Sequence, residues 1–182
     1  PIDLFHTRRI GENANYGIDT SSAGQSKDAL VLGATKIAGK SDSGFSYGFI
    51  AAKTASQNRL SSSNSIFTLD ANNTDYHDYY ISRLTKDFFS GNSYMGMTIT
   101  NFTNNDKQSS IISYDGMYNL FNNRLFIDSQ IIRSISTEDG LGAFLEIEYS
   151  IPNFIQIGSS IEYYDKNLDI NDIGYLMRNN LM

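Results

Sequence analysis

The connections between the patterned segments of this chain alternate in length. The tight connections cover residues 39–44, 89–92, 121–124 and 151–153, and the long ones cover 54–75, 103–110, 134–142 and 165–172. Bacterial outer-membrane β-barrels are built this way, with short periplasmic turns and longer external loops between strands of about ten residues. A soluble meander has no physical reason to place its short loops on one side. The alternation therefore predicts antiparallel hairpins with two unlike ends.

Eight segments between these connections alternate apolar and polar residues, which is the signal of a half-buried strand. They cover residues 30–38, 45–53, 79–86, 94–102, 111–120, 125–133, 142–151 and 154–164. In the seventh segment Leu145 and Ile147 share one face, and Glu146 and Glu148 share the other, because side chains alternate across a strand. We predict an all-β, antiparallel, up-and-down meander of about eight strands, part of a transmembrane outer-membrane β-barrel.

Composition excludes several function classes. The net charge of −6 disfavours a nucleic-acid partner, because phosphate contacts need clustered Lys and Arg. Cysteine is absent, which excludes a disulfide framework, a thiol nucleophile and a thiolate metal site. No apolar run approaches the roughly 18 residues of a spanning helix. Residues 1–182 are interpreted as a fragment of a single β-barrel domain, an internal piece of a longer protein, with no second domain.

The polar faces of the predicted strands supply the candidate site. The predicted lumen-facing residues are Arg83, Asp115, Asp128, Glu146, Glu148 and Glu162. Basic residues are expected to neutralise the acids across the lumen, namely Lys36, Arg83, Arg124 and Arg133. A polar, partly charged lumen is what a barrel of this kind requires. The candidates for interfacial aromatic girdles are Tyr47, Tyr80, Tyr114, Tyr118, Tyr149 and Tyr163. The alternative for these tyrosines is ordinary cross-strand aromatic pairing in a soluble sheet.

No catalytic residue, cofactor or metal site is predicted. Asp165, Asn167 and Asp169 place oxygen ligands at alternate positions, which resembles half of a calcium loop, but the Gly at its sixth position and the acid at its twelfth are missing. A solvated acidic loop is the favoured interpretation. His6 and His77 are too few for a transition-metal site and are expected at the surface.

Several strings along the chain resemble one family in the same order. They are LFHTRRIG at residues 4–11, LGATKIAGK at 32–40, GFSYGFIAAKT at 44–54, SRLTKDFFSGNSYMGMTITN at 82–101 and NDIGYLMRN at 171–179. Together they resemble domain of unknown function 5916. The resemblance implies an outer-membrane barrel region in bacterial proteins that carry an N-terminal family-9-like carbohydrate-binding domain. It implies no reaction, and the binding domain is absent from this chain.

The predicted function is that of an outer-membrane barrel segment acting as a pore, a transporter or a membrane anchor of a glycan-associated protein. Its expected partners are the lipid bilayer with lipopolysaccharide, glycans, and the rest of the same barrel with its N-terminal domain. The predicted location is the bacterial outer membrane. One alternative is a soluble or periplasmic carbohydrate-binding β-sandwich, whose apolar faces would pack on a second sheet. A weaker alternative is a membrane-associated hydrolase that uses lumen carboxylates such as Glu146 and Glu148.

Overall fold

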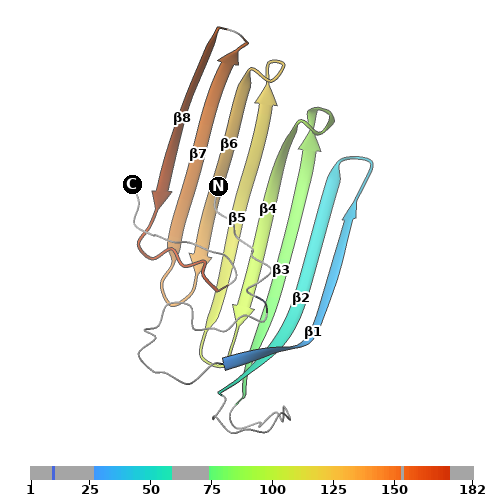
Figure 1. The fold of residues 1–182 in the computed structure, drawn as a ribbon, viewed down its shortest axis with the longest axis vertical. Coiled ribbons are helices and arrows are strands. Elements are labelled where there is room, and N and C mark those ends of the chain that lie inside the picture. The colour runs from blue at the N-terminus through green and yellow to red at the C-terminus, as the bar shows by residue number, and fades with distance from the viewer. Residues whose placement is uncertain (1–9, 11–26, 59–73, 153, 173–182) are drawn as a thin grey trace.

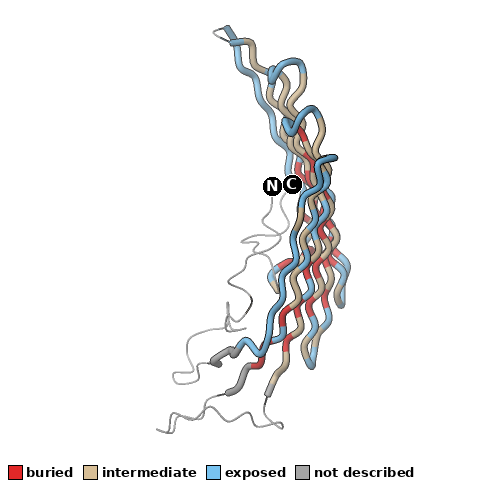
Figure 2. Tube along the Cα trace, turned by 90° about the vertical axis from the view of Figure 1, so that its right-hand side faces the viewer, coloured by how far each residue is buried: buried red, intermediate tan, exposed pale blue. Residues whose placement is uncertain are grey.

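The computed structural model describes residue 10 and residues 27–58, 74–152 and 154–172. These residues form one antiparallel sheet whose strands lie in chain order, a curved single layer seen face-on in Figure 1 and edge-on in Figure 2. The strands are β1 (Lys27–Lys40), β2 (Phe45–Asn58), β3 (Thr74–Phe88), β4 (Ser93–Thr103), β5 (Gln108–Leu120), β6 (Leu125–Ile135), β7 (Gly140–Ile151) and β8 (Ile155–Tyr164). A single turn of 3-10 helix, η2 (Phe89–Gly91), joins β3 to β4.

The antiparallel eight-strand meander predicted from the alternation is confirmed. The sheet is open in the described residues, because β1 and β8 each pair with one neighbour only. Closure into a barrel and passage through a membrane therefore stay predictions. In the described part of the chain, no helix has the length and apolarity needed to cross a bilayer.

The segregation of loop lengths is weaker than the sequence indicates. β4 ends at Thr103 and β5 begins at Gln108, and β6 ends at Ile135 and β7 begins at Gly140. These two connections are therefore as short as the tight turns at the other end. The strands continue through residues taken for loop because the backbones of Ser109 and Ser134 stay in register with Phe102 and Gly140. Only the β2–β3 connection remains long.

The strand register separates the side chains into two faces. Residues directly opposite each other on neighbouring strands point the same way, so the pairs Arg83–Thr98, Thr98–Ser113 and Ser113–Ile132 follow one face across the sheet. We call this the polar face, and the opposite surface the apolar face. Both clusters of buried apolar residues lie on the polar face: Ala52, Tyr79, Ile81 and Phe102 in one, and Ile111, Ile132, Tyr164, Leu168 and Ile170 in the other.

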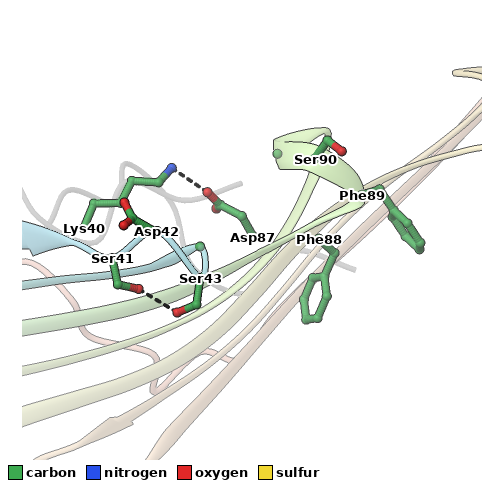
Figure 3. Close-up of a pocket in the computed structure, with 10 residues that line it drawn as sticks. Lys40, Ser41, Asp42, Ser43, Asp87, Phe88, Phe89 and Ser90 are labelled. Atoms are coloured by element: carbon green, nitrogen blue, oxygen red, sulfur yellow. Dashed lines mark hydrogen bonds and ion pairs between the residues drawn. The ribbon is translucent and has the colours of Figure 1, made fainter.

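Short turns close the hairpins at one end of the sheet (Figure 3). There the Lys40 ammonium lies 2.5 Å from the Asp87 carboxylate and links β1 to β3. Two turns place a phenylalanine in the left-handed region, Phe89 at φ 51° and Phe121 at φ 53°. Because a bulky side chain rarely adopts positive φ, these turns are strained. Both rings are exposed.

Candidate functional site

An ion pair lies in the middle of the polar face. Arg83 on β3 donates from Nη2 to Asp115 Oδ2 on β5 at 2.6 Å, and from Nη1 to Asp115 Oδ1 at 2.8 Å. Nη1 also donates to Thr98 Oγ1 at 2.6 Å. The pair passes over Gly96 of the strand between them, where a Cβ atom would lie 3.0 Å from Nη2 and 3.1 Å from the carboxylate. Gly96 thus leaves room for a bidentate pair that spans three strands.

Acidic residues follow on the polar face of β6, β7 and β8. Asp128 stands directly opposite Glu146, while Glu148 and Glu162 stand opposite Phe126 and Phe144. All six predicted lumen residues therefore share one face of the sheet. Their role in lining a lumen stays a prediction. Within the described residues no salt bridge joins this acidic group to a basic side chain, and Glu148 accepts a hydrogen bond from Gln156.

Basic residues were expected to neutralise these acids, and for one of them this is wrong. Arg133 lies on the apolar face of β6, because it stands opposite Ile112 and Leu141. Its guanidinium pairs with Asp139 at 2.7 Å in the following connection. Lys36 does lie on the polar face, opposite Ile50. Of the basic residues expected to neutralise the acids, Lys36 and Arg83 thus lie on the polar face of β1 and β3, and the predicted acids lie on the same face from β5 to β8.

Residues 165–172 fold back over the polar face after β8. Leu168 and Ile170 are fully buried against Ile111, Ile132 and Tyr164. The segment crosses the lower ends of β7 and β6 (Figure 1). It lies so close to β7 that a Cβ atom on Gly140 would meet the Leu168 nitrogen at 2.3 Å. The prediction of a solvated acidic loop is therefore wrong for Leu168 and Ile170, because these two apolar side chains anchor the segment to the sheet.

Polar contacts hold the far end of the same segment. We call the contacts of Lys107 and Ser109 with Asp169 and Asp172 the polar lock. Lys107, between β4 and β5, contacts the carboxylates of Asp169 at 3.0 Å and Asp172 at 2.8 Å. Ser109 Oγ donates to Asp172 at 2.5 Å, and the Asp169 N–H donates to Ser134 Oγ. The described residues contain no group of three or more His, Cys, Asp or Glu placed to hold a metal ion. Of the weak calcium candidates, Asp169 is bound to Lys107 and Asp165 accepts the Asn167 N–H.

The contacts of the polar lock shift the pKa values of Asp169 and Lys107. Burial works to raise the pKa of Asp169, but the hydrogen bonds from Lys107 and from the Asn171 N–H outweigh it and leave the pKa below its ordinary 3.8. Burial likewise works to lower the pKa of Lys107, and its hydrogen bonds to Asp172 and Asp169 leave the pKa above 10.5. A lowered acid pKa gives stability that is present above about pH 3.8 and lost below it. A raised lysine pKa gives stability that is lost above pH 10.5.

We therefore expect residues 165–172 to loosen from the sheet below about pH 4. The chain has no cysteine, so a spin label on Lys166→Cys, at an exposed position, would report the segment alone. The label should be immobile at pH 7 and gain mobility as the pH falls below 3.8, toward the lowered pKa of Asp169. In a Lys107→Met background the mobility should be higher at pH 7 and change less with acid. If the spin label in the parent protein were equally mobile at pH 7 and at pH 3, the polar lock would not be what holds residues 165–172 against the sheet.

The apolar face carries its charges only toward the strand ends. Every exposed large apolar side chain of β2–β8 lies on this face. All six tyrosines predicted as girdle residues also lie there, with Tyr118 partly buried and the other five exposed. Among the strand residues whose side chains are described, its charged members are Lys53, Asp78, Lys86 and Arg133. Lys53 pairs with Asp78 at 3.1 Å near one end, and Lys86 lies near the other. Between them the face is uncharged.

Two features of the polar face were not predicted from the sequence. His77, expected at the surface, is 4% exposed and packs edge-on against Tyr79 and Phe102. Ile10 packs against the same cluster from outside the sheet. His6 lies outside the described residues, so its expected place at the surface stays a prediction. His77 precedes the predicted strand segment 79–86, so the alternation gave no indication that it is buried.

Residues 2–182 match the family model described as Domain of unknown function (DUF5916). The chain belongs to this family. The resemblance predicted from the ordered strings is thus confirmed, and the match includes the whole described sheet and the fold-back segment. No curated protein and no solved structure matched the chain. The DUF5916 description names no activity, so function rests on the two faces of the sheet.

Proposed function

We propose that this sheet is part of a transmembrane β-barrel of the bacterial outer membrane, with the apolar face against lipid and the polar face lining a lumen. One observation carries the proposal: the apolar face has a charge-free belt, bounded by Lys86 near one strand end and by Lys53, Asp78 and Arg133 near the other. A sheet that spans a bilayer needs such a belt, because charged side chains on its lipid face are costly at mid-depth and tolerated near the interfaces.

The height of the belt fits a bilayer. Asp78 and Lys86 are eight residues apart on β3, which corresponds to about 26 Å along the strand at roughly 3.3 Å per residue. Tilted by about 40°, that length projects to some 20 Å, close to the apolar band of about 25 Å found on outer-membrane barrels. Lysine at the boundary adds to the usable height, because its long stem can lie on apolar surface while its ammonium reaches water.

The polar face supports the second half of the proposal. A lumen needs polar and charged side chains in the middle of its strands, where Arg83, Asp115 and Glu146 lie. Residues 165–172 cover the polar face at the end opposite the tight turns and would narrow the lumen there. The acidic group on β6–β8 would draw cations toward that wall. The same architecture serves a pore, a transporter or an anchor.

The soluble sandwich is less well supported. A sandwich would cover the apolar face with a second sheet about 10 Å away. The described residues form a single sheet, and Tyr47, Tyr114 and Ile161 on that face remain 54%, 56% and 68% exposed. An attached glycan-binding role follows from the family resemblance alone.

The first test is cell fractionation of the full-length protein in a Gram-negative host. We expect recovery in the outer membrane and a fast-migrating band on a gel run without boiling, which boiling abolishes, because a closed barrel resists detergent unfolding. A soluble protein recovered from the periplasm, with one mobility before and after boiling, would overturn the proposal.

A further inference from the structure

A groove crosses the apolar face near its tight-turn end. Its floor is the row in which Met95, Gly116 and Ser129 stand opposite one another on β4, β5 and β6. Gly116 has no side chain and is buried, because the Tyr118 ring lies over it, 2.9 Å from where a Cβ atom would stand. Ser129 turns its hydroxyl to the Gly116 carbonyl at 3.2 Å, so the floor is low beside this ring. The groove is lined by side chains from β2 to β6.

Large apolar side chains form the two walls. Leu84, Met97, Tyr114 and Ile131 stand in the next row on one side, and Tyr118 stands on the other with its ring against Gly116. Leu84, Tyr114 and Ile131 are 49%, 56% and 57% exposed. Met95 is itself 47% exposed, so the walls project only beyond Ser129 and the Tyr118 ring. The groove between them is an apolar channel of the shape that a single hydrocarbon chain fills.

A cation stands at one end of this channel. Lys86 lies in the same row, directly opposite Met95, and is the only charged side chain that the described strands place at the tight-turn end of the apolar face. Its ammonium lies 4.5 Å from the centre of the Phe45 ring and donates to the Ser43 carbonyl. It has no carboxylate partner among the described salt bridges. An apolar channel that ends at an unneutralised ammonium is complementary to an acyl chain attached to an anionic headgroup.

We propose that this groove is a binding site for one anionic phospholipid, with an acyl chain across Met95, the Tyr118 ring and Ser129 and the headgroup phosphate at Lys86. The inference rests on the proposed membrane location and goes beyond it, because an ordinary lipid-facing surface needs no apolar channel that leads to its boundary lysine. Short turns of outer-membrane barrels are periplasmic, and with the tight turns on that side the site lies in the phospholipid leaflet of the outer membrane.

The test is native mass spectrometry of the full-length protein released from non-ionic detergent containing dioleoyl phosphatidylglycerol. We expect one retained lipid on the parent protein. Ser129→Leu fills the floor and should weaken retention at least about tenfold, equivalent to about 1.4 kcal/mol. Ser159→Leu is the matched control, since Ser159 faces the same side from β8, far from the groove. It should retain the lipid as the parent does.

The headgroup is tested separately with dioleoylglycerol, which has the same chains and no phosphate. The parent should prefer phosphatidylglycerol, and Lys86→Gln should lose that preference while Lys53→Gln, at the opposite end of the face, keeps it. The unboiled gel shift first shows whether each variant folds. If Ser129→Leu does not fold, the loss of headgroup preference in Lys86→Gln is the result that tests the lipid site. An inserted parent that retains no lipid, or equal retention by Ser129→Leu and Ser159→Leu, would overturn the lipid site alone. A parent recovered as a soluble protein would overturn it together with the membrane proposal.

Discussion

Gly140→Ala should expel residues 165–172 from the polar face. The added Cβ would lie 2.3 Å from the Leu168 nitrogen and 2.4 Å from its Cα, and both are backbone atoms that cannot rotate aside. The segment must therefore move as a whole and expose Leu168 and Ile170, which are now fully buried. At about 1.5–3 kcal/mol for each side chain, the lost burial is an upper estimate of roughly 3–6 kcal/mol, enough to detach the segment at neutral pH.

The spin label on Lys166→Cys measures this detachment. In Gly140→Ala the label should be mobile at pH 7, as in the acid-treated parent. Gly158→Ala is the matched control, because Gly158 lies on the polar face of β8 and a Cβ there would approach nothing closer than 3.8 Å. If the protein forms a pore, Gly140→Ala should also raise its conductance in planar bilayers. An equally immobile label in both glycine variants would show that the segment is not held against Gly140.

The strands and their faces could be predicted from the sequence because both are local properties. An alternation such as that of Leu145, Glu146, Ile147 and Glu148 fixes the direction of each side chain without knowledge of any other strand. The pairing order followed because short connections join neighbouring antiparallel strands. The strand ends at Ser109 and Ser134 were missed because the hydroxyls that make these segments look like loops are used by residues 165–172.

The fold-back segment could not be predicted because its partners are remote in sequence. Leu168 contacts a site on β7 opened by Gly140 and Gly142, and Asp169 pairs with Lys107, which precedes it by 62 residues. The sequence did contain a signal: Leu168 and Ile170 are two apolar residues in an otherwise polar stretch, and two glycines at alternate positions of β7 leave one face without side chains. Neither the apolar pair nor the glycine pair indicates a contact by itself, because the contact requires knowing which strands lie beside residues 165–172.

Replacing Ile147 with Arg should destabilise the protein in a bilayer by about 2–4 kcal/mol, the cost of a basic side chain on the lipid face of a barrel near mid-depth. Ile147 lies within the uncharged stretch of β7, opposite Ile127 and Ser159, and is 41% exposed. A surface facing water would accept Arg at this exposure with little change, within about 0.5 kcal/mol. The substitution therefore distinguishes lipid from water on the apolar face.

Glu146→Gln and Glu148→Gln are the matched controls, because these neighbours on the same strand face the other way. Both should leave stability nearly unchanged, since Gln keeps the size and polarity of the side chain and removes charge from an acidic wall. The chain has no Trp, so the folded fraction is best followed by the unboiled gel shift after urea titration in phospholipid vesicles. Equal losses at all three positions would mean that β7 does not separate a lipid face from a polar face, and the membrane proposal would then lose its main support.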